Sequence, residues 1–350
     1  MKIGTTVGIM VPRKRQRKAV LRTYNKYNNL DISLACFIPE DINWKKKKIL
    51  ALCMDKGVIK ERVISFPQAV YNCCYLNQRK TIERMERIIG KNKTFNYLNR
   101  LNKWEVYRIL ESTHLRRFLP HTCIYKREQL QKTFDKHKLV YLKPCLGHHG
   151  NGVFRLELLN ENLRISEDSL PPRYIWRLDD KQLAGKVERL LKGKQYIVQS
   201  GISMTLFNDK YFDLRALVQK NEQGDWDITS IVSRLAYKQY YNTSVYEEVH
   251  ITEVIMHSLF PPDESIKIMK TIQDVSIQAA AELEKGIGLM AEVSVDYGLD
   301  INGALWIIEM NGKPQKKIYN DVAGIGDRSA MYRRPLEYAS YLAAQSTTSI

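Results

Sequence analysis

Residues 306–314 read Trp-Ile-Ile-Glu-Met-Asn-Gly-Lys-Pro, and the alternation in this stretch is typical of a β-strand. Successive side chains of a strand point to opposite faces, so Glu309 and Asn311 share one face. That face presents a carboxylate and an amide oxygen. The residues expected on the other face, where they can pack in a core, are Trp306, Ile308 and Met310.

Residues 290–297 read as the partner strand of a hairpin, with the turn-rich residues 299–303 between the two strands. Asp296 can then lie opposite Glu309 and Asn311. Two carboxylates and one amide oxygen are hard donors, which Mg²⁺ prefers together with phosphate oxygens and water. The alternative is a hairpin whose exposed edge happens to be acidic. The alignment of three donors beside Gly-Lys-Pro favours a magnesium site.

A second candidate site follows the strand-like residues 139–142, which end in Lys143. The next residues form a glycine-rich loop that contains Gly147, Gly150 and Gly152. A fixed cation and exposed backbone N–H groups suit the oxygens of a triphosphate. The order of residues matches neither the P-loop nor the dinucleotide fingerprint. A plain tight turn after a strand is the alternative interpretation.

Arginine side chains on two other predicted strands are candidates for anion binding. Asp213 and Arg215 share the polar face of one strand, and Arg234 ends the next apolar run. An arginine in such a place can clamp a phosphate or carboxylate with two hydrogen bonds. An exposed Asp/Arg strand face is the alternative. Gln199 closes another strand, and the segment after it, with Ile202, can present backbone groups to adenine.

These elements in this order resemble the ATP-grasp superfamily, and more closely the YheC/YheD family of spore-coat-associated ATP-grasp proteins. The resemblance covers roughly residues 60–340, and its matching stretches are 102–107, 118–126, 142–152, 198–199, 212–215 and 306–314. It implies an α+β ATP-grasp fold, in which two subdomains clasp ATP, preceded by a small α/β N-terminal domain. ATP and Mg²⁺ are the implied cofactors.

The resemblance also implies a role for each matching residue. In the nucleotide site, Lys103 and Lys143 would contact the ATP phosphates, Gln199 and Ile202 would border the adenine, and Asp213 would lie nearby. Gly147, Gly150 and Gly152 would form a mobile lid over the triphosphate. Arg215 and Arg234 would be catalytic and hold the transferred phosphate, and Asp296, Glu309 and Asn311 would bind Mg²⁺. Two departures matter. The glycine pair expected after Asn242 is missing from residues 240–244, a stretch that would face the substrate, which puts the substrate class and turnover in doubt. His148 and His149 in the lid fit no pattern that can be assigned.

The chain is divided, on this reading, into a basic α/β domain at residues 1–95, a helical linker at 96–125 and an ATP-grasp domain at 126–345. The ATP-grasp domain would comprise a small subdomain at 126–200 and a large one at 201–345. Within the first domain, residues 44–55 are predicted to be helical. In the last, Ile268, Ile272, Val275, Ala279 and Leu283 line one face of a predicted helix.

The 350 residues carry a net charge of +17, and the excess lies in the first part of the chain. Residues 1–140 hold 31 Lys and Arg against 11 Asp and Glu, a net +20, whereas the remainder is at −3. Such a field favours an acidic partner, which could be nucleic acid, an anionic polymer or an anionic surface. A solvated basic face without a ligand is the alternative. No recognised nucleic-acid motif is present, so a nucleic-acid partner is not favoured.

The absence of long apolar runs and the spacing of the cysteines indicate the cellular compartment of the protein. No run approaches the roughly 20 apolar residues of a membrane-spanning helix, and the start of the chain lacks the pattern of a signal peptide. The six cysteines are scattered without zinc-site spacing, which suits a reduced cytosolic compartment. We therefore expect a cytoplasmic protein, with spore association implied by the resemblance.

Three functions compete at this point. The preferred one is a carboxylate–amine ligase, which uses Mg-ATP to convert a carboxylate into an acyl phosphate and then joins it to an unidentified amine as an amide. The basic region suggests that the carboxylate substrate is acidic overall. The second is a spore-associated binding or structural protein that keeps the fold with little catalysis. The third is a nucleic-acid-binding protein led by the basic region.

Overall fold

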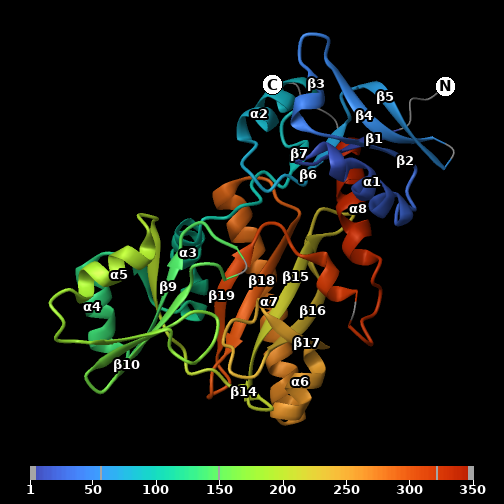
Figure 1. The fold of residues 1–350 in the computed structure, drawn as a ribbon. Coiled ribbons are helices and arrows are strands. Elements are labelled where there is room, and N and C mark those ends of the chain that lie inside the picture. Colours follow the sequence, from blue (N-terminus) through green and yellow to red (C-terminus); the bar gives the residue numbers. More distant parts are fainter. Residues whose placement is uncertain (1–4, 56, 149, 321, 346–350) are drawn as a thin grey trace.

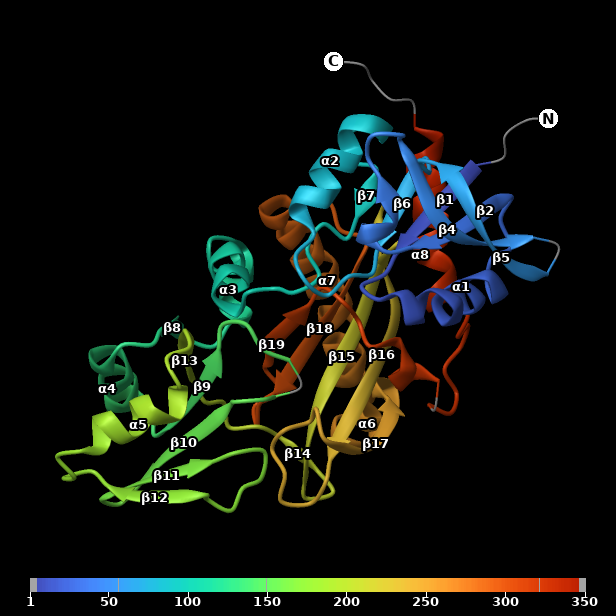
Figure 2. The same cartoon turned by 45° about the horizontal axis from the view of Figure 1, so that its top comes forward.

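A computed structural model describes residues 5–55, 57–148, 150–320 and 322–345. These residues form three β-sheets that lie next to one another, with helices packed around them (Figures 1 and 2). The N-terminal residues form the first sheet, the middle of the chain forms the second, and the C-terminal part forms the third. No helix of the described residues has the length and apolar character needed to cross a membrane.

The first sheet is built from residues 5–95. Its elements are β1 (Thr5–Met10), η1 (Lys14–Gln16), α1 (Arg17–Lys26), β2 (Ile32–Phe37), η2 (Pro39–Asp41), β3 (Ile42–Asn43), β4 (Lys48–Asp55), β5 (Val58–Ser65), β6 (Ala69–Asn72), α2 (Arg79–Ile89) and β7 (Thr94–Phe95). β2, β1, β6 and β7 run parallel, and their long apolar runs are buried on both faces, as is typical of parallel strands. Residues of α1 join the core on one face of the sheet, and residues of α2 join the core on the other.

The predicted helix at residues 44–55 is wrong. β4 pairs antiparallel with β5 along its whole length, from Lys48 opposite Ser65 to Asp55 opposite Val58. Ile49 is buried whereas Lys48 is exposed, which is the alternation of a strand with one covered face. Periodicity alone does not separate a short apolar helix from a strand. The cross-strand pairing with β5 settles the structure here.

The second sheet is antiparallel, in the order β12-β11-β10-β9-β13-β8. Its elements are β8 (Thr122–Ile124), α4 (Arg127–Lys136), β9 (Leu139–Pro144), β10 (Phe154–Leu159), β11 (Asn162–Ser166), β12 (Tyr174–Arg177), α5 (Leu183–Leu191) and β13 (Tyr196–Ser200). Apolar residues of α4 and α5 pack into one core with the sheet. That face is therefore covered by helices, and β9 and β13 are neighbouring strands between β10 and the edge strand β8.

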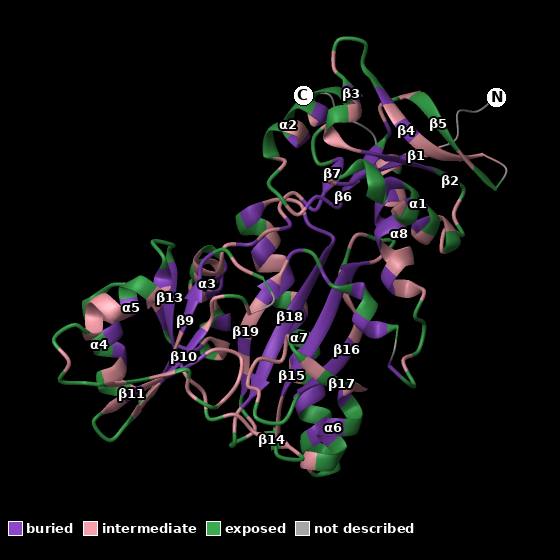
Figure 3. Ribbon diagram, in the orientation of Figure 1, coloured by how far each residue is buried: buried purple, intermediate pink, exposed green. Residues whose placement is uncertain are grey.

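The third sheet has the order β17-β16-β15-β18-β19, with β14 paired to β15. Its strands and the helices near it are α3 (Lys103–Glu111), η3 (His114–Phe118), β14 (Leu206–Phe207), β15 (Lys210–Lys220), β16 (Trp226–Ala236), β17 (Tyr246–Ile251), α6 (Thr252–Leu259), α7 (Pro262–Ile287), β18 (Glu292–Leu299), β19 (Leu305–Asn311), η4 (Lys316–Tyr319) and α8 (Ala330–Ala344). Figure 3 shows that β15, β16 and β18 are largely buried. The predicted core face of α7 is confirmed, because the five residues predicted to line that face are all buried.

The domain boundaries predicted from sequence stay a prediction. The first sheet ends with β7 at Phe95, and the second sheet runs from Thr122 to Ser200. α8 lies within the predicted ATP-grasp range, yet it packs against β1 and β6 as well as β15 (Figures 1 and 2). The C-terminal helix therefore joins the first sheet to the third.

Candidate active site

A cavity with two adjoining chambers lies beside the second and third sheets. The first chamber contains about 1010 Å³ of empty space, part of it open to solvent, which is a size typical of small-molecule sites. The second chamber extends toward the first sheet, where Tyr75 and Asn99 line it. Residues that line both chambers, and so form their shared wall, are Gly147, His148, Arg234, Ser244, Asp296 and Glu309.

Every site residue predicted from sequence lines one of the chambers, except Gly152. Those lining only the first chamber are Lys103, Lys143, Gly150, Gln199, Ile202 and Asp213. Those lining only the second are Arg215 and Asn311, whereas Gly147, Arg234, Asp296 and Glu309 line both. The fold thus brings together residues that are as far apart in the sequence as Lys103 and Asn311.

Two lysines reach the first chamber from different elements. Lys143 is the last residue but one of β9, and its Nζ donates a hydrogen bond to Gln199 Oε1 on the neighbouring strand β13 at 2.6 Å. Burial lowers the pKa of Lys143 to about 8. Lys103 begins α3, because the Asn102 side chain caps that helix, and its Nζ lies 2.9 Å from Glu309 Oε1.

Two arginines and two aspartates form a buried cluster across three neighbouring strands. Arg215 on β15 donates from Nε and Nη2 to the two carboxylate oxygens of Asp296 on β18, at 2.7 and 2.6 Å. Arg234 on β16 donates from Nε to Asp213 Oδ1 at 2.9 Å and from Nη2 to Asp296 Oδ2 at 3.3 Å. Burial acts to raise the pKa of Asp296, but both guanidinium groups outweigh it and hold that pKa below its usual value.

The hairpin of β18 and β19 places the predicted metal ligands side by side. Asp296 pairs with Glu309, and Ser294 pairs with Asn311. The register shifts after Asp296, so β19 contains one extra residue at Ile308.

The bulge overturns the predicted core face of this strand. Trp306 and Ile308 are only half-buried, and Ile308 lines the first chamber. Ile307 is buried in the core instead, while Met310 is buried as predicted. Strict alternation fails here because the extra residue shifts the strand by one position. Side chains that precede the bulge therefore point to the face opposite to the predicted one.

The glycine loop lies against Asn242, in the stretch that lacks the expected glycine pair. Gly150 has φ +70° and Gly152 has φ +75°, a conformation that residues with a Cβ adopt rarely. A Cβ at Gly150 would overlap the side chain of Asn242, which donates to Asp168 Oδ1 at 2.6 Å. Residues 242–244 line the first chamber, so the stretch faces the site. His149 lies outside the described residues.

The family described as YheC/D-like ATP-grasp matches residues 91–342, which is more than half of the chain. The chain belongs to the YheC/D-like ATP-grasp family. This confirms the resemblance and the ATP-grasp fold predicted from the sequence. The match includes both chambers' strands and leaves out β1 to β6.

The YheC/D-like chain is also similar to individual proteins. "Endospore coat-associated protein YheD" of Bacillus subtilis (strain 168) is 26% identical over 333 residues, which is 90% of this chain and 72% of that protein. The VanG D-Ala:D-Ser ligase from Enterococcus faecalis has a TM-score of 0.54 at 12% identity and covers 96% of this chain and 99% of its own. The ATP-grasp ligase PsnB, solved with a minimal precursor, Mg and ADP, has a TM-score of 0.53 at 13% identity over 97% and 98% of the two chains. At such identities these solved structures show the shared fold.

The first chamber of this ATP-grasp protein is lined by both apolar and cationic groups. Ile202, Met204 and Ile308 supply apolar surface, and the Ile202 N–H has no hydrogen-bond partner among the described residues. Lys143 and Lys103 supply cations to the same chamber. An apolar wall with one unpaired backbone donor fits an adenine ring, and buried cations fit phosphates.

The shared wall also fits Mg²⁺. The described residues contain no group of three or more His, Cys, Asp or Glu that could hold a metal. The donors here are instead two carboxylates, Asp296 and Glu309, and the amide of Asn311, which is a set that suits Mg²⁺ with phosphate oxygens and water. Opposite Asn311, the hydroxyl of Ser294 is buried without a hydrogen-bond partner among the described residues. An unsatisfied polar atom at this position is consistent with a site completed by a ligand.

Sequence reasoning missed several residues of the ATP-grasp site. Ser294 shares the face of Asp296 two positions away on β18, so the strand period alone could have identified it. Thr243, inside the stretch 240–244 expected to face the substrate, donates to Asp213 Oδ2 at 2.7 Å, a contact that the sequence did not indicate. Tyr75 lines the second chamber from beyond the end of β6. No local pattern marks Tyr75, because only the tertiary packing brings it to the site.

Proposed function

We propose that the chain is a Mg-ATP-dependent enzyme that activates a carboxylate as an acyl phosphate and then joins it to an amine. The supporting observation is the shared wall, where Arg234, Asp296 and Glu309 line both chambers. A nucleotide in the first chamber would present its terminal phosphate at this wall. A substrate in the second chamber would meet that phosphate from the other side.

The residues of the first chamber would bind and orient the nucleotide. Ile202 would receive the adenine, and Lys143 and Lys103 would pair with phosphate oxygens. Asp296, Glu309 and Asn311 would hold Mg²⁺, which when bound neutralises phosphate charge and orients the terminal phosphate. Gly150 and its loop would cover the phosphates with backbone N–H groups and exclude water.

The second chamber would hold the carboxylate. The Nη1 groups of Arg215 and Arg234 have no hydrogen-bond partner among the described residues, although their other nitrogens do. Lys313 also lines the chamber, and these three cations outnumber the two carboxylates there, Asp296 and Glu309, which favours an anionic substrate and an acidic one in particular. These cations would neutralise the charge that develops during phosphoryl transfer.

The chemistry then has two displacements. A carboxylate oxygen attacks the terminal phosphorus, forming a new O–P bond while the bridging O–P bond to ADP breaks. An amine nitrogen attacks the acyl carbon, the C–N bond forms, phosphate leaves with the electron pair, and the amine proton passes to solvent. No protein nucleophile takes part, so the contribution of the chain is positioning and charge neutralisation.

A second candidate is a spore-associated binding protein that keeps the fold without turnover. The name of the YheD relative, which describes coat association, is what favours it. Either candidate includes spore association for this chain. A thermal-shift assay with and without Mg-ATP shows whether the chain binds the nucleotide, since a ligand that binds the native state raises its melting temperature. Absence of any shift would favour a non-catalytic role.

The test of the ligase is an ADP-release screen across amino acids, acidic peptides and wall-type carboxylates. We expect ADP release that depends on one class of carboxylate. Glu309→Ala and Asn311→Ala are expected to lower it at least about a hundredfold, because each removes a metal ligand. Unchanged turnover in both variants would contradict the metal assignment, and no carboxylate-dependent release in the wild type would contradict the ligase.

A further inference from the structure

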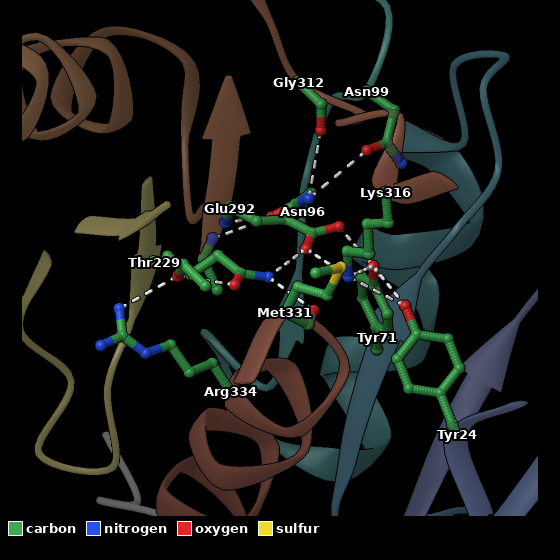
Figure 4. Close-up of polar contacts among 12 residues, drawn as sticks. Tyr24, Tyr71, Asn96, Asn99, Thr229, Glu292, Gly312, Lys316, Met331 and Arg334 are labelled. Carbon is green, nitrogen blue, oxygen red and sulfur yellow. Dashed lines mark hydrogen bonds and ion pairs between the residues drawn. The ribbon is translucent and has the colours of Figure 1, made fainter. Parts of the chain in front are cut away.

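A buried ion pair lies where the first and third sheets meet, outside both chambers. Lys316 Nζ is 2.7 Å from Glu292 Oε2, and the two side chains are 8% and 2% exposed. Lys316 also donates to the hydroxyl of Tyr24 at 3.0 Å and of Tyr71 at 3.4 Å. Its ammonium lies over both tyrosine rings, 5.3 and 5.6 Å from their centroids (Figure 4). Every side of this charge is therefore contacted by protein groups.

The partners of Lys316 come from parts of the chain that are remote in sequence. Tyr24 belongs to α1, which packs on the first sheet, and Tyr71 belongs to β6 of that sheet, whereas Glu292 begins β18. The Tyr71 hydroxyl also donates to Glu292 (Figure 4). Gln219 of β15 donates to Glu292 Oε2 at 2.9 Å and to the carbonyl of Met331 at 3.0 Å. The network thus joins the first sheet, the third sheet and the start of α8.

Lys316 is also the last of three attachments on one loop. This loop, residues 312–316, follows the proposed metal ligands directly. The Gly312 carbonyl accepts from Asn96 Nδ2 at 3.2 Å, and Lys313 Nζ donates to the Cys73 carbonyl at 2.6 Å. A Cβ at Gly312 would lie 2.9 Å from the Leu98 carbonyl oxygen, so only glycine permits this approach. Residues 73–98 therefore hold the start of the loop, and Tyr24, Tyr71 and Glu292 hold its end at Lys316.

Stability alone is a poor reason for this arrangement. Burying two charges costs several kcal/mol of desolvation, and apolar replacements of buried pairs are often neutral or stabilising. A buried pair does, however, fix the position of the chain that carries it. Here the fixed chain is the loop that begins one residue after Asn311. We infer that Lys316 and Glu292 are positioning residues, which hold this loop so that Asn311 and Glu309 can bind Mg²⁺. This inference rests on the proposed function.

Lys316→Met tests it, with Lys220→Met as the matched control. Lys220 is equally buried and lies 2.7 Å from Glu284 Oε1, but it is on the opposite face of β15 from Gln219. ADP binding is measured by calorimetry over a series of Mg²⁺ concentrations. Lys316→Met is expected to raise the half-saturating Mg²⁺ concentration about tenfold or more, to leave Mg²⁺-free ADP binding within about twofold, and to regain wild-type affinity at saturating Mg²⁺. Lys220→Met is expected to leave the Mg²⁺ response unchanged.

Two outcomes overturn the positioning role. In the first, Lys316→Met and Lys220→Met shift the Mg²⁺ response equally, which would mean a general loss of stability. In the second, neither shifts it. If Lys316→Met does not fold, the double variant with Glu292→Gln removes the unpaired charge and carries the same expectation. A wild-type protein whose ADP binding ignores Mg²⁺ would instead contradict the proposed metal site, and the inference with it.

Discussion

Lys143 carries a positive charge in a place where water reaches it poorly. Its side chain is buried on β9, with Gln199 as its hydrogen-bond partner. Burial lowers its pKa to about 8 from the ordinary lysine value of 10.5. The protonated form therefore destabilises the native state near neutral pH, a cost that is understandable if the cation is kept for phosphate.

Lys143→Met is expected to stabilise the nucleotide-free protein at pH 7, by on the order of 1–3 kcal/mol. The folded lysine loses its proton near pH 8 and the unfolded one near 10.5. Between these two pH values the native state binds fewer protons than the unfolded state, so the free energy of unfolding of the wild type rises with pH. The extra stability of Lys143→Met over the wild type therefore shrinks. Urea unfolding from pH 7 to pH 10 measures this.

The matched control for that experiment is Lys138→Met, at an exposed lysine one residue before β9. We expect it to leave stability nearly unchanged at each pH. The methionine at position 143 is also expected to abolish the thermal shift caused by ADP. The pKa argument would be contradicted if Lys143→Met were less stable than wild type at pH 7 and if the difference in stability were the same at pH 10.

The element that carries the site is the hairpin of β18 and β19. The sequence was sufficient to predict its two strands and the juxtaposition of Asp296 with Glu309, because strand alternation and a turn-rich connection are local signals. It was insufficient for the bulge at Ile308, since a bulge depends on the register with β18. The β4–β5 hairpin shows the same limit, because cross-strand pairing rather than local periodicity makes residues 48–55 a strand.

The glycine loop provides an element-scale prediction. Gly150→Ala is expected to displace the loop, because Gly150 has positive φ and the new Cβ would meet Asn242. We expect the ADP-induced thermal shift to fall substantially, with a loss of stability of about 1 kcal/mol. Gly57→Ala is the control, because Gly57 also has positive φ, of 81°, but open space around it. Equal effects of both variants on ADP binding would show that Asn242 does not hold the loop in place.

At the scale of the whole molecule, three sheets meet around one cavity. The order of motifs was enough to predict an ATP-grasp fold, since that order is a property of the entire chain. The packing of α8 against the first sheet was not predictable, because an amphipathic helix does not specify which apolar surface it covers. The same holds for Lys316, whose partners Tyr24 and Tyr71 lie far away in sequence.

The claim that unites these scales is that Asp296, Glu309 and Asn311 bind a divalent cation between a nucleotide and the second chamber. A crystal structure with Mn²⁺ and a non-hydrolysable ATP analogue, with anomalous diffraction data for the manganese, tests it most directly. The account predicts a manganese peak at bonding distance from oxygens of these residues, with the adenine beside Ile202. A peak elsewhere, or a nucleotide outside the first chamber, would contradict it.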